Sequence, residues 1–416
     1  MIEAAEKKEQ HLASKSPVSG APIWSALLFT AIPFICLAVP MYVISPFRPQ
    51  DYSQLAAALT IRSLGPWLSA IAAVVVLAIT ARAWGRSKRV LPRLAMATLC
   101  LLVLIGSGFT HVNIFEVMFH PYKLPAFTDP GSAKVDADDK VLAVKINGEA
   151  RSYPIRTMGY HHIVNDIVGG QPLAVTYCTL CHTGLVWSRI LNGKTLHFRL
   201  AGINNGNALM RDEETSSIWQ QSTGEAIFGP WKGQHLDLIH SDEMTFALWR
   251  TEQPKGQVLA PDTQYASDYD PKDWEKHVEK TRTVIDTSKS GIAPHELMLG
   301  VTIASQSKAY PLKSVLAAKL IQDQIGEVPL LIVVGPDGAS FRVFKVTPNP
   351  SPMNFIVTSG SSGIIMHDAE TGSDWNFEGC AVAGKLTGQC LQALDGNKDY
   401  WFDWLNHHSK TQVFRG

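Results

Sequence analysis

The sequence predicts an α+β fold that is mainly β, built as a tandem pseudo-repeat of two similar β-rich halves preceded by three transmembrane helices. Three observations predict it. The long apolar runs all lie before residue 116, a block of sequence recurs further along the chain, and both copies of that block alternate apolar and polar residues as strands do. The chain has 416 residues, which is enough for two domains beside a membrane region.

The apolar runs extend from Pro22 to Ile44, from Gly65 to Trp84 and from about Val90 to Phe115. Each is close to the roughly 20 residues that a helix needs to cross the hydrocarbon of a bilayer. The first run follows a polar leader and has no clear small-x-small cleavage site, so we expect it to remain as a membrane span. The lipid bilayer is therefore an expected partner.

The positive-inside rule predicts the orientation of the spans. Five basic residues (Arg82, Arg86, Lys88, Arg89 and Arg93) lie where the second run ends and the third begins, whereas the segment between the first and second runs carries only Arg48 and Arg62. The basic loop and the N-terminus are therefore expected in the cytoplasm. The chain after residue 116 is expected outside the inner membrane of a bacterium, in the periplasm. Lys and Arg together number 37, as do Asp and Glu, so no basic surplus indicates a nucleic-acid partner.

The region after the spans contains an internal sequence repeat, with two similar copies in tandem. Tyr310-Pro311 follows Tyr153-Pro154 by 157 residues (310 − 153), and later blocks keep the match at offsets of 156 and 155. The predicted boundaries are a cytoplasmic tail at 1–21, a membrane region at 22–115, a first exported repeat at 116–260, a linker at 261–295 and a second exported repeat at 296–416.

Each copy is expected to contain mostly strands and one short helix. The stretches "KVLAVKI", "PLAVTY", "GLVWSRI" and "KTLHFRL" of the first copy alternate or are rich in β-branched and aromatic residues. The helix is expected within "PIRTMGYHHIVNDIVGG", which has apolar residues at helical spacing and ends in Gly-Gly.

The stretch "YCTLCHTG" contains the most informative residues of the first copy. Cys178, Cys181 and His182 spell the C-x-x-C-H string of c-type haem attachment, but two such thiols also hold metals or form a disulfide. At an offset of 157 the two cysteines fall on Gly335 and Gly338 of a Gly-Pro-Asp-Gly turn. We therefore expect a hairpin tip, which points two sulfurs at one place as zinc and iron knuckles do.

Two thiols do not complete a metal site, and His161 is the candidate third ligand. The positions that match His161 and His162 in the second copy are Ala318 and Lys319, so that copy lacks the thiols and the histidines together at the matching positions. This joint absence predicts a transition-metal site for copper, iron or zinc, or thiol redox chemistry, in the first copy alone. No nucleophile and base pair stands out, so whether the protein is an enzyme is left open.

Two alternatives remain beside that hypothesis. One is a structural or binding domain in which Cys178 and Cys181 form a disulfide, and the other is a c-type haem protein that uses His182. Cys380 and Cys390, ten residues apart in the second copy, are candidates for a disulfide.

The motifs resemble a known family. "GEARSYPIRTMGYHHIVNDIVGGQPLAVTYCTLCHTGLVW", "DEETSSIWQQ" and "GPWKG" are similar to domain of unknown function 3179, over about Val141 to Phe414. The resemblance implies importance for His161, Asn165, Asp166, Tyr177, Cys178, Cys181, Gly184, Asp212, Glu214, Thr215, Trp219 and Gln221. Relatives usually have a small or amide residue where this chain has His182, which weakens the haem alternative. The resemblance to this family implies no particular activity.

Overall fold

The computed structural model describes residues 21–122, 124–346, 354–358 and 364–416. It divides into two units. The helical unit comprises the chain up to residue 45 and residues 50–114, and the C-terminal unit comprises residues 46–49 and 115–416. The predicted N-terminal tail lies outside the described residues apart from its last position.

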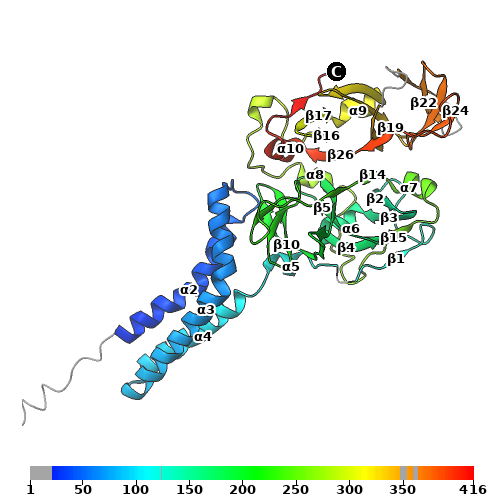
Figure 1. Ribbon diagram of the computed structural model, residues 1–416. Coiled ribbons are helices and arrows are strands. Elements are labelled where there is room, and N and C mark those ends of the chain that lie inside the picture. The colour runs from blue at the N-terminus through cyan, green and yellow to red at the C-terminus, as the bar shows by residue number, and fades with distance from the viewer. Residues whose placement is uncertain (1–20, 123, 347–353, 359–363) are drawn as a thin grey trace, which may run out of the picture. The chain divides into compact units, whose positions relative to one another are not determined.

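The helical unit contains three helices that are long and apolar enough to cross a membrane, namely α2 (Ala21–Val43), α3 (Tyr52–Arg86) and α4 (Val90–Phe109). They pack side by side (Figure 1) through small side chains such as Ala26 and Ala72. The second helix begins well before the predicted run at Gly65, because Asp51 caps its N-terminus and accepts a hydrogen bond from the Gln54 amide at 2.9 Å.

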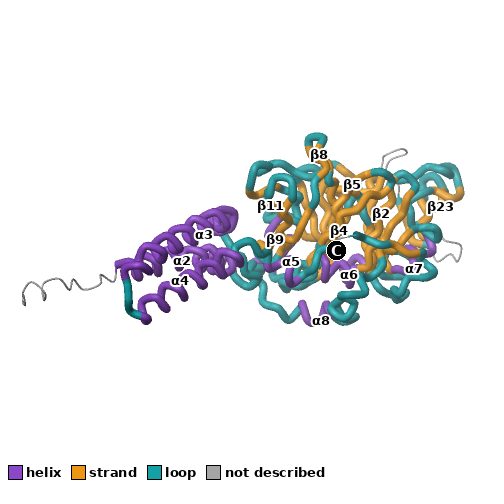
Figure 2. The backbone as a smooth tube through the Cα atoms, turned by 90° about the horizontal axis from the view of Figure 1, so that it is seen from below, coloured by secondary structure: helices purple, strands orange, loops and turns teal. Residues whose placement is uncertain are grey.

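The C-terminal unit is α+β and mainly β (Figure 2). Its first part holds three sheets, whose strands are given in spatial order. The first sheet is formed by β1 (Phe127–Thr128), β15 (Gln257–Leu259), β3 (Glu149–Pro154), β2 (Lys140–Ile146) and β14 (Asp242–Thr245). The second is formed by β13 (Leu238–Ile239), β6 (Thr183–Ser188), β5 (Gln171–Cys178) and β4 (Ile163–Val168). The third is formed by β12 (Ala226–Phe228), β11 (Ile218–Gln220), β10 (Asn207–Asp212) and β9 (Phe198–Asn204). A short ladder joins β7 (Ile190–Leu191) to β8 (Lys194–Thr195).

Its last part holds three more sheets. One is formed by β26 (Gly396–Tyr400), β16 (Leu297–Ile303), β17 (Gln306–Pro311) and β27 (Gln412–Val413). The next is formed by β18 (Leu320–Ile325), β19 (Val328–Val334), β20 (Phe341–Lys345) and β25 (Gln392–Leu394). The last is formed by β21 (Phe355–Val357), β22 (Ile364–Asp368), β23 (Ser373–Asn376) and β24 (Ala381–Ala383). The pairing is antiparallel except where β15 meets β3 and β27 meets β17.

Short helices precede the first strand or lie between later strands. They are α5 (Ile114–Met118), α6 (Ile155–His161), α7 (Phe246–Glu252), α8 (Trp274–Val278), a 3₁₀ turn at Ser288–Ser290, α9 (Leu312–Ala318) and α10 (Trp401–His407). The short helix expected within residues 154–170 is α6, which ends at His161. His162 takes a left-handed φ of 62°, which stops the helix, and the β-branched residues after it form β4.

Equivalent pairings occur in the two parts of the unit. Val141 pairs with Pro154 in the first part, and Met298 pairs with Pro311 in the last part. Ile163 pairs with Thr176, and Leu320 pairs with Val333. The order of elements from β2 to β6, with α6 after the second strand, is also the order from β16 to β20 with α9.

Residues 261–295, the predicted linker, contribute side chains that pack against the core of the C-terminal unit. Trp274 is buried among the core residues of the first sheets, and Val278 and Ile285 contact core residues too. Residues 261–295 therefore contribute side chains to the region round the thiol turn.

Candidate functional site

The two thiols lie at the tip of a hairpin, as the sequence predicts. Cys178 ends β5 and pairs with Thr183 at the start of β6. Both cysteines are free, and their exposed fractions are 2% and 0%. Cys178 Sγ lies 3.6 Å from the carbonyl oxygen of Gly206, and Cys181 Sγ lies 3.8 Å from that of Cys178. The pair is part of a packed core and does not lie at the surface.

Asn207 is the polar residue in direct contact with a sulfur. Its amide Nδ2 lies 3.1 Å from Cys181 Sγ, and it is fully buried at the start of β10. The Asn207 side-chain oxygen accepts from Gln220 Nε2 at 2.6 Å and from the Ser222 backbone amide at 3.1 Å, which fixes the orientation of the amide. A donor aimed at sulfur stabilises a thiolate.

Two carboxylates from the end of the chain face this turn. Asp399 Oδ1 accepts a hydrogen bond from the Thr183 hydroxyl at 2.7 Å, and Asp403 Oδ2 lies 3.1 Å from Asn207 Nδ2. The Tyr400 amide also donates to the carbonyl of Cys181 at 2.9 Å. Both aspartates are buried, so β26 and α10 bring two acidic groups beside two thiols.

Burial dominates the electrostatics of this cluster. It raises the pKa of the Cys181 thiol well above its ordinary value, and the Cys178 thiol and the Asp403 carboxylate act in the same direction. Burial also raises the pKa of Asp399 well above its usual range, to which the nearby Asp403 charge adds. Such a cluster resists full ionisation unless a cation neutralises it.

His182 is held by hydrogen bonds on both ring nitrogens. Nε2 lies 2.6 Å from Glu275 Oε1, and Nδ1 lies 3.0 Å from the Tyr177 hydroxyl. Because a carboxylate only accepts, Nε2 carries a proton, and burial lowers the pKa of the ring. The hydrogen bond from His182 in turn lowers the pKa of Glu275 to about 2. As a haem ligand, His182 would have to give up one of these contacts.

His161 lies in a cluster of aromatic rings. Its Nδ1 donates to the backbone oxygen of His120 at 2.6 Å, and its Nε2 lies 3.0 Å from the hydroxyl of Tyr269. Burial lowers the pKa of the ring, so the neutral form is favoured. The Tyr122 ring lies 4.4 Å from the His161 ring, centroid to centroid.

The proposed ligands Cys178, Cys181 and His161 are not gathered round one point. Among the described residues, Asp136, Asp138 and Asp139 form a group of three whose ligand atoms lie within 4.8 Å of one another, and the predicted set forms no such group. Asp136 and Asp138 are exposed and both pair with Lys272, so they indicate no site.

The other family-motif residues divide into two sets. Tyr177 and Gln221 contact the thiol turn, since Gln221 Nε2 donates to the Thr183 carbonyl at 3.2 Å. The rest hold the backbone elsewhere. Asn165 bonds to Phe198, Asp166 to Tyr153 and Arg151, Asp212 to Thr215 and Trp219, and Glu214 to His197.

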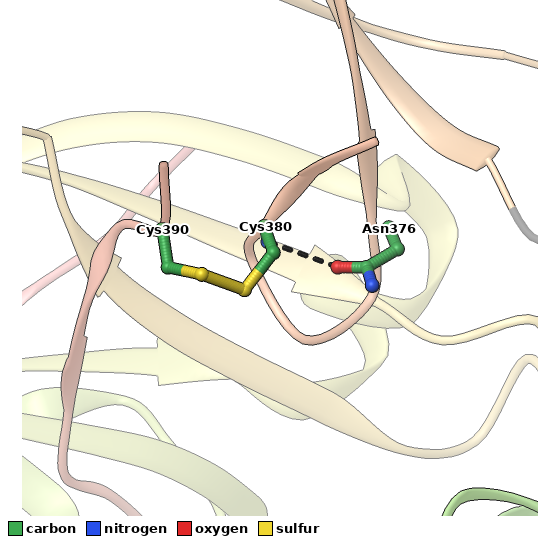
Figure 3. The surroundings of a disulfide bond; sticks show 3 residues. All are labelled: Asn376, Cys380 and Cys390. Atoms are coloured by element: carbon green, nitrogen blue, oxygen red, sulfur yellow. Dashed lines mark hydrogen bonds between the residues drawn. A yellow bond between two sulfur atoms is a disulfide. The ribbon is translucent and has the colours of Figure 1, made fainter. Parts of the chain in front are cut away.

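Cys380 and Cys390 form the disulfide that their spacing suggests (Figure 3). The Cys380 amide donates to the side-chain oxygen of Asn376 at 2.9 Å, which fixes the loop before β24.

Sequence reasoning did not single out Asn207, Thr183, Asp399 and Asp403. Asn207 stands in the Asn- and Gly-rich stretch "GINNGNALM", which is typical of a turn. At the offset of 155 that the repeat itself supplies, Asp399 and Asp403 match Met244 and Leu248, so a comparison of the copies contained the signal.

The three long apolar helices indicate a membrane-associated protein, and the C-terminal unit that carries the buried thiol turn is mainly β. The family model for a protein of unknown function, DUF3179, matches residues 122–411, and the chain belongs to that family. No curated protein and no solved structure matches the chain.

Proposed function

We propose that the protein binds a transition-metal ion through the thiolates of Cys178 and Cys181. The observation that carries the proposal is a pair of buried cysteines on one turn that form no disulfide. The Asn207 amide lies 3.1 Å from one of the two sulfurs. Hairpin turns of this kind hold zinc and iron through paired thiolates, and copper also accepts sulfur ligands.

Burial favours metal binding over thiol redox chemistry. Thiol–disulfide exchange needs an accessible thiolate, and reactive cysteines have a lowered pKa. Cys181 is fully buried and burial raises its pKa. A metal ion replaces the thiol protons and supplies the positive charge that the site lacks.

We also propose that the C-terminal unit lies outside the inner membrane of a bacterium, with the N-terminus in the cytoplasm. The basic loop between α3 and α4 supports this orientation. The disulfide between Cys380 and Cys390 fits an oxidising compartment such as the periplasm.

The C-terminal unit is, in our proposal, a duplicated domain. The sequence match and the equivalent strand registers support it. Leu142 pairs with Glu243, and Leu299 pairs with Lys398. Likewise Arg151 pairs with Gln257, and Lys308 pairs with Gln412. The thiols are present in the first copy only, so chemistry belongs to one copy and the other serves as its structural partner.

Elemental analysis of the full-length protein in detergent tests the metal site. We expect copper, iron or zinc to copurify with the wild type and to be lost from Cys178→Ser/Cys181→Ser. A Cys36→Ser/Cys100→Ser variant is the matched control, because it removes two thiols outside the site and should keep the metal. Wild type that stays metal-free after loading with each ion would refute the proposal.

Two further measurements separate the alternatives. Each disulfide removes two hydrogens from the mass of the reduced chain. A non-reducing mass lower by four hydrogens, two for the Cys380–Cys390 disulfide and two more, would indicate a Cys178–Cys181 disulfide. A Soret band that persists after denaturation would indicate covalent haem.

A further inference from the structure

We propose that α5 lies in the headgroup layer of the bilayer and that the lipid covers its exposed apolar face. The C-terminal unit, to which α5 is packed, is thereby held on the membrane surface. This inference goes beyond the proposed metal site and is independent of it. It rests on the membrane spans alone.

One side of α5 packs against the core of the C-terminal unit. The Phe119 amide donates to the Phe115 carbonyl at 2.8 Å, so the two rings lie one helical turn apart. Both rings contact the core cluster that includes Cys178 and Cys181. α5 is therefore joined to the part of the unit that holds the thiol turn.

A second side of α5 is apolar and exposed. Ile114, Val117 and Met118 have the i, i+3, i+4 spacing that places side chains on one helix face. Their exposed fractions are 41%, 53% and 55%. A helix with apolar residues on more than one side is normally covered on each of them, and an exposed apolar face marks an interaction site.

The membrane surface can be located on α3. Arg62 and Arg82 flank a stretch without charged residues, and they are 20 positions apart (82 − 62). At 1.5 Å per residue this stretch is about 30 Å long, which equals the thickness of the hydrocarbon layer. Arg62 therefore marks one edge of that layer.

Asn113 lies at the level of Arg62. Its side-chain oxygen accepts a hydrogen bond from Arg62 Nη2 at 2.8 Å, and α5 begins at the next residue. Five helical residues extend only about 7.5 Å, even where the helix stands upright on the membrane. The headgroup layer of each leaflet is about 5–8 Å thick, so the chain keeps Val117 and Met118 within reach of lipid.

A matched control position lies at the other end of the C-terminal unit. The sheet that contains β22 and β24 is far from α5 (Figure 1), and β21 is its edge strand. Ile356 on β21 is 53% exposed, as is Val117. The two residues are both β-branched and apolar, and only one of them is expected to meet lipid.

Spin-label accessibility in the full-length protein tests the inference. Labels are attached at Val117→Cys or Ile356→Cys, and the protein is placed in vesicles of phosphatidylethanolamine and phosphatidylglycerol. Collisions with oxygen, which concentrates in lipid, are compared with collisions with a water-soluble nickel chelate. We expect the oxygen-to-nickel ratio at position 117 to exceed that at position 356 severalfold.

The native cysteines do not interfere. The background is Cys36→Ser/Cys100→Ser, which removes the thiols of the spans. The thiols of the turn are buried, and the two cysteines of the second copy form a disulfide. The unlabelled positions of this background are checked by the absence of spin label before the cysteines are added.

Each outcome supports or overturns the inference. Equal ratios at positions 117 and 356 would overturn it. Shielding of the 117 label from both reagents would also overturn it, because a protein partner, such as a second copy, would then cover this face. If Val117→Cys does not fold, Met118→Cys on the same face decides by the same comparison.

Failure of the inference can be told apart from failure of the membrane spans and of the metal site. Val74 lies near the middle of α3 and is 67% exposed, so a label at Val74→Cys should collide mainly with oxygen. A nickel-accessible label there would refute the spans themselves. The metal content of the wild type is measured separately and depends on none of these labels.

Discussion

The hydroxyl of Thr183 donates a hydrogen bond to Asp399 Oδ1 at 2.7 Å, although the two residues are 216 positions apart in the chain. Thr183 follows the thiol turn directly, and Asp399 lies on β26 just before α10. The bond joins the first and last parts of the C-terminal unit at the candidate site. The shape of the thiol turn therefore depends on residues close to the C-terminus.

Replacement of Thr183 by Val should destabilise the C-terminal unit. The change keeps the volume but removes the donor to Asp399, in a site that is fully buried. Loss of a buried hydrogen bond that leaves its partner unsatisfied costs about 1–3 kcal/mol. Tryptophan fluorescence during urea unfolding measures the loss. Thr302→Val is the control, because Thr302 is exposed and bonds only to Ser307 nearby, and an equal effect in both variants would contradict the expectation.

Gly206→Ala should disturb the contact between the thiol turn and α10. Gly206 has a φ of 101°, and a Cβ there would lie 2.8 Å from the ring of Phe402. The substitution therefore adds a steric clash to the strain of a positive φ, for a total of about 2–4 kcal/mol. Thermal unfolding followed by circular dichroism gives the loss.

Gly193→Ala separates the two contributions. Gly193 also has a positive φ, of 75°, but nothing lies within 4 Å of its Cβ position. We expect this variant to lose only the strain energy of an L-residue at positive φ, about 1–2 kcal/mol. Equal losses at the two glycines would show that the contact with Phe402 contributes nothing.

The places of strands were predictable where the local pattern and the repeat agreed. "KVLAVKI" forms β2, and the hairpin tip at Cys178 to Thr183 was expected from the Gly-Pro-Asp-Gly turn of the second copy. The run "KTLHFRL" alternates as a single strand would, but the structure breaks it at Leu196, between β8 and β9. Local alternation does not reveal such a break, because it depends on which neighbours each half pairs with.

The thiols of the candidate site were predictable, but their neighbours were not. The C-x-x-C spacing and its absence from the second copy are visible in the sequence. Asn207 is brought to Cys181 by the pairing of β10 with β9 and β11, and Asp403 by the packing of α10. Such contacts depend on tertiary packing over long separations, which periodicity and turn signals do not report.

Removal of the disulfide by Cys380→Ser/Cys390→Ser should lower stability by about 2–3 kcal/mol, because the cross-link closes a short loop. Urea unfolding with and without a reductant measures it. The reductant should weaken the wild type to the level of the variant and leave the variant unchanged. A wild type insensitive to reductant, with free thiols accounting for all cysteines, would contradict the disulfide.

Asp212→Ala and Asp368→Ala should have similar structural costs. Asp212 accepts from Trp219 Nε1 at 2.8 Å, and Asp368 accepts from Trp375 Nε1 at 2.8 Å. Each also caps a turn through a threonine, so each variant leaves a buried indole N–H unsatisfied and should lose about 2–4 kcal/mol. Thermal unfolding measures the stability of each variant. Titration with cobalt(II), which occupies zinc sites and absorbs visible light, measures its metal binding. Loss of cobalt binding in folded Asp212→Ala would instead assign this motif residue to the site.

The buried His162 should make the protein less stable in acid. Burial lowers its pKa to about 4, whereas an unfolded histidine has a pKa near 6.5. The neutral ring therefore contributes stability that is fully present above about pH 6.5 and is lost as the pH falls towards 4, by about 3 kcal/mol in all. His162→Asn, which tolerates the left-handed φ of 62°, should flatten the fall in unfolding free energy over this range. The exposed His277→Asn is the control and should keep the wild-type slope, and an unchanged slope in His162→Asn would show that this histidine does not titrate as proposed.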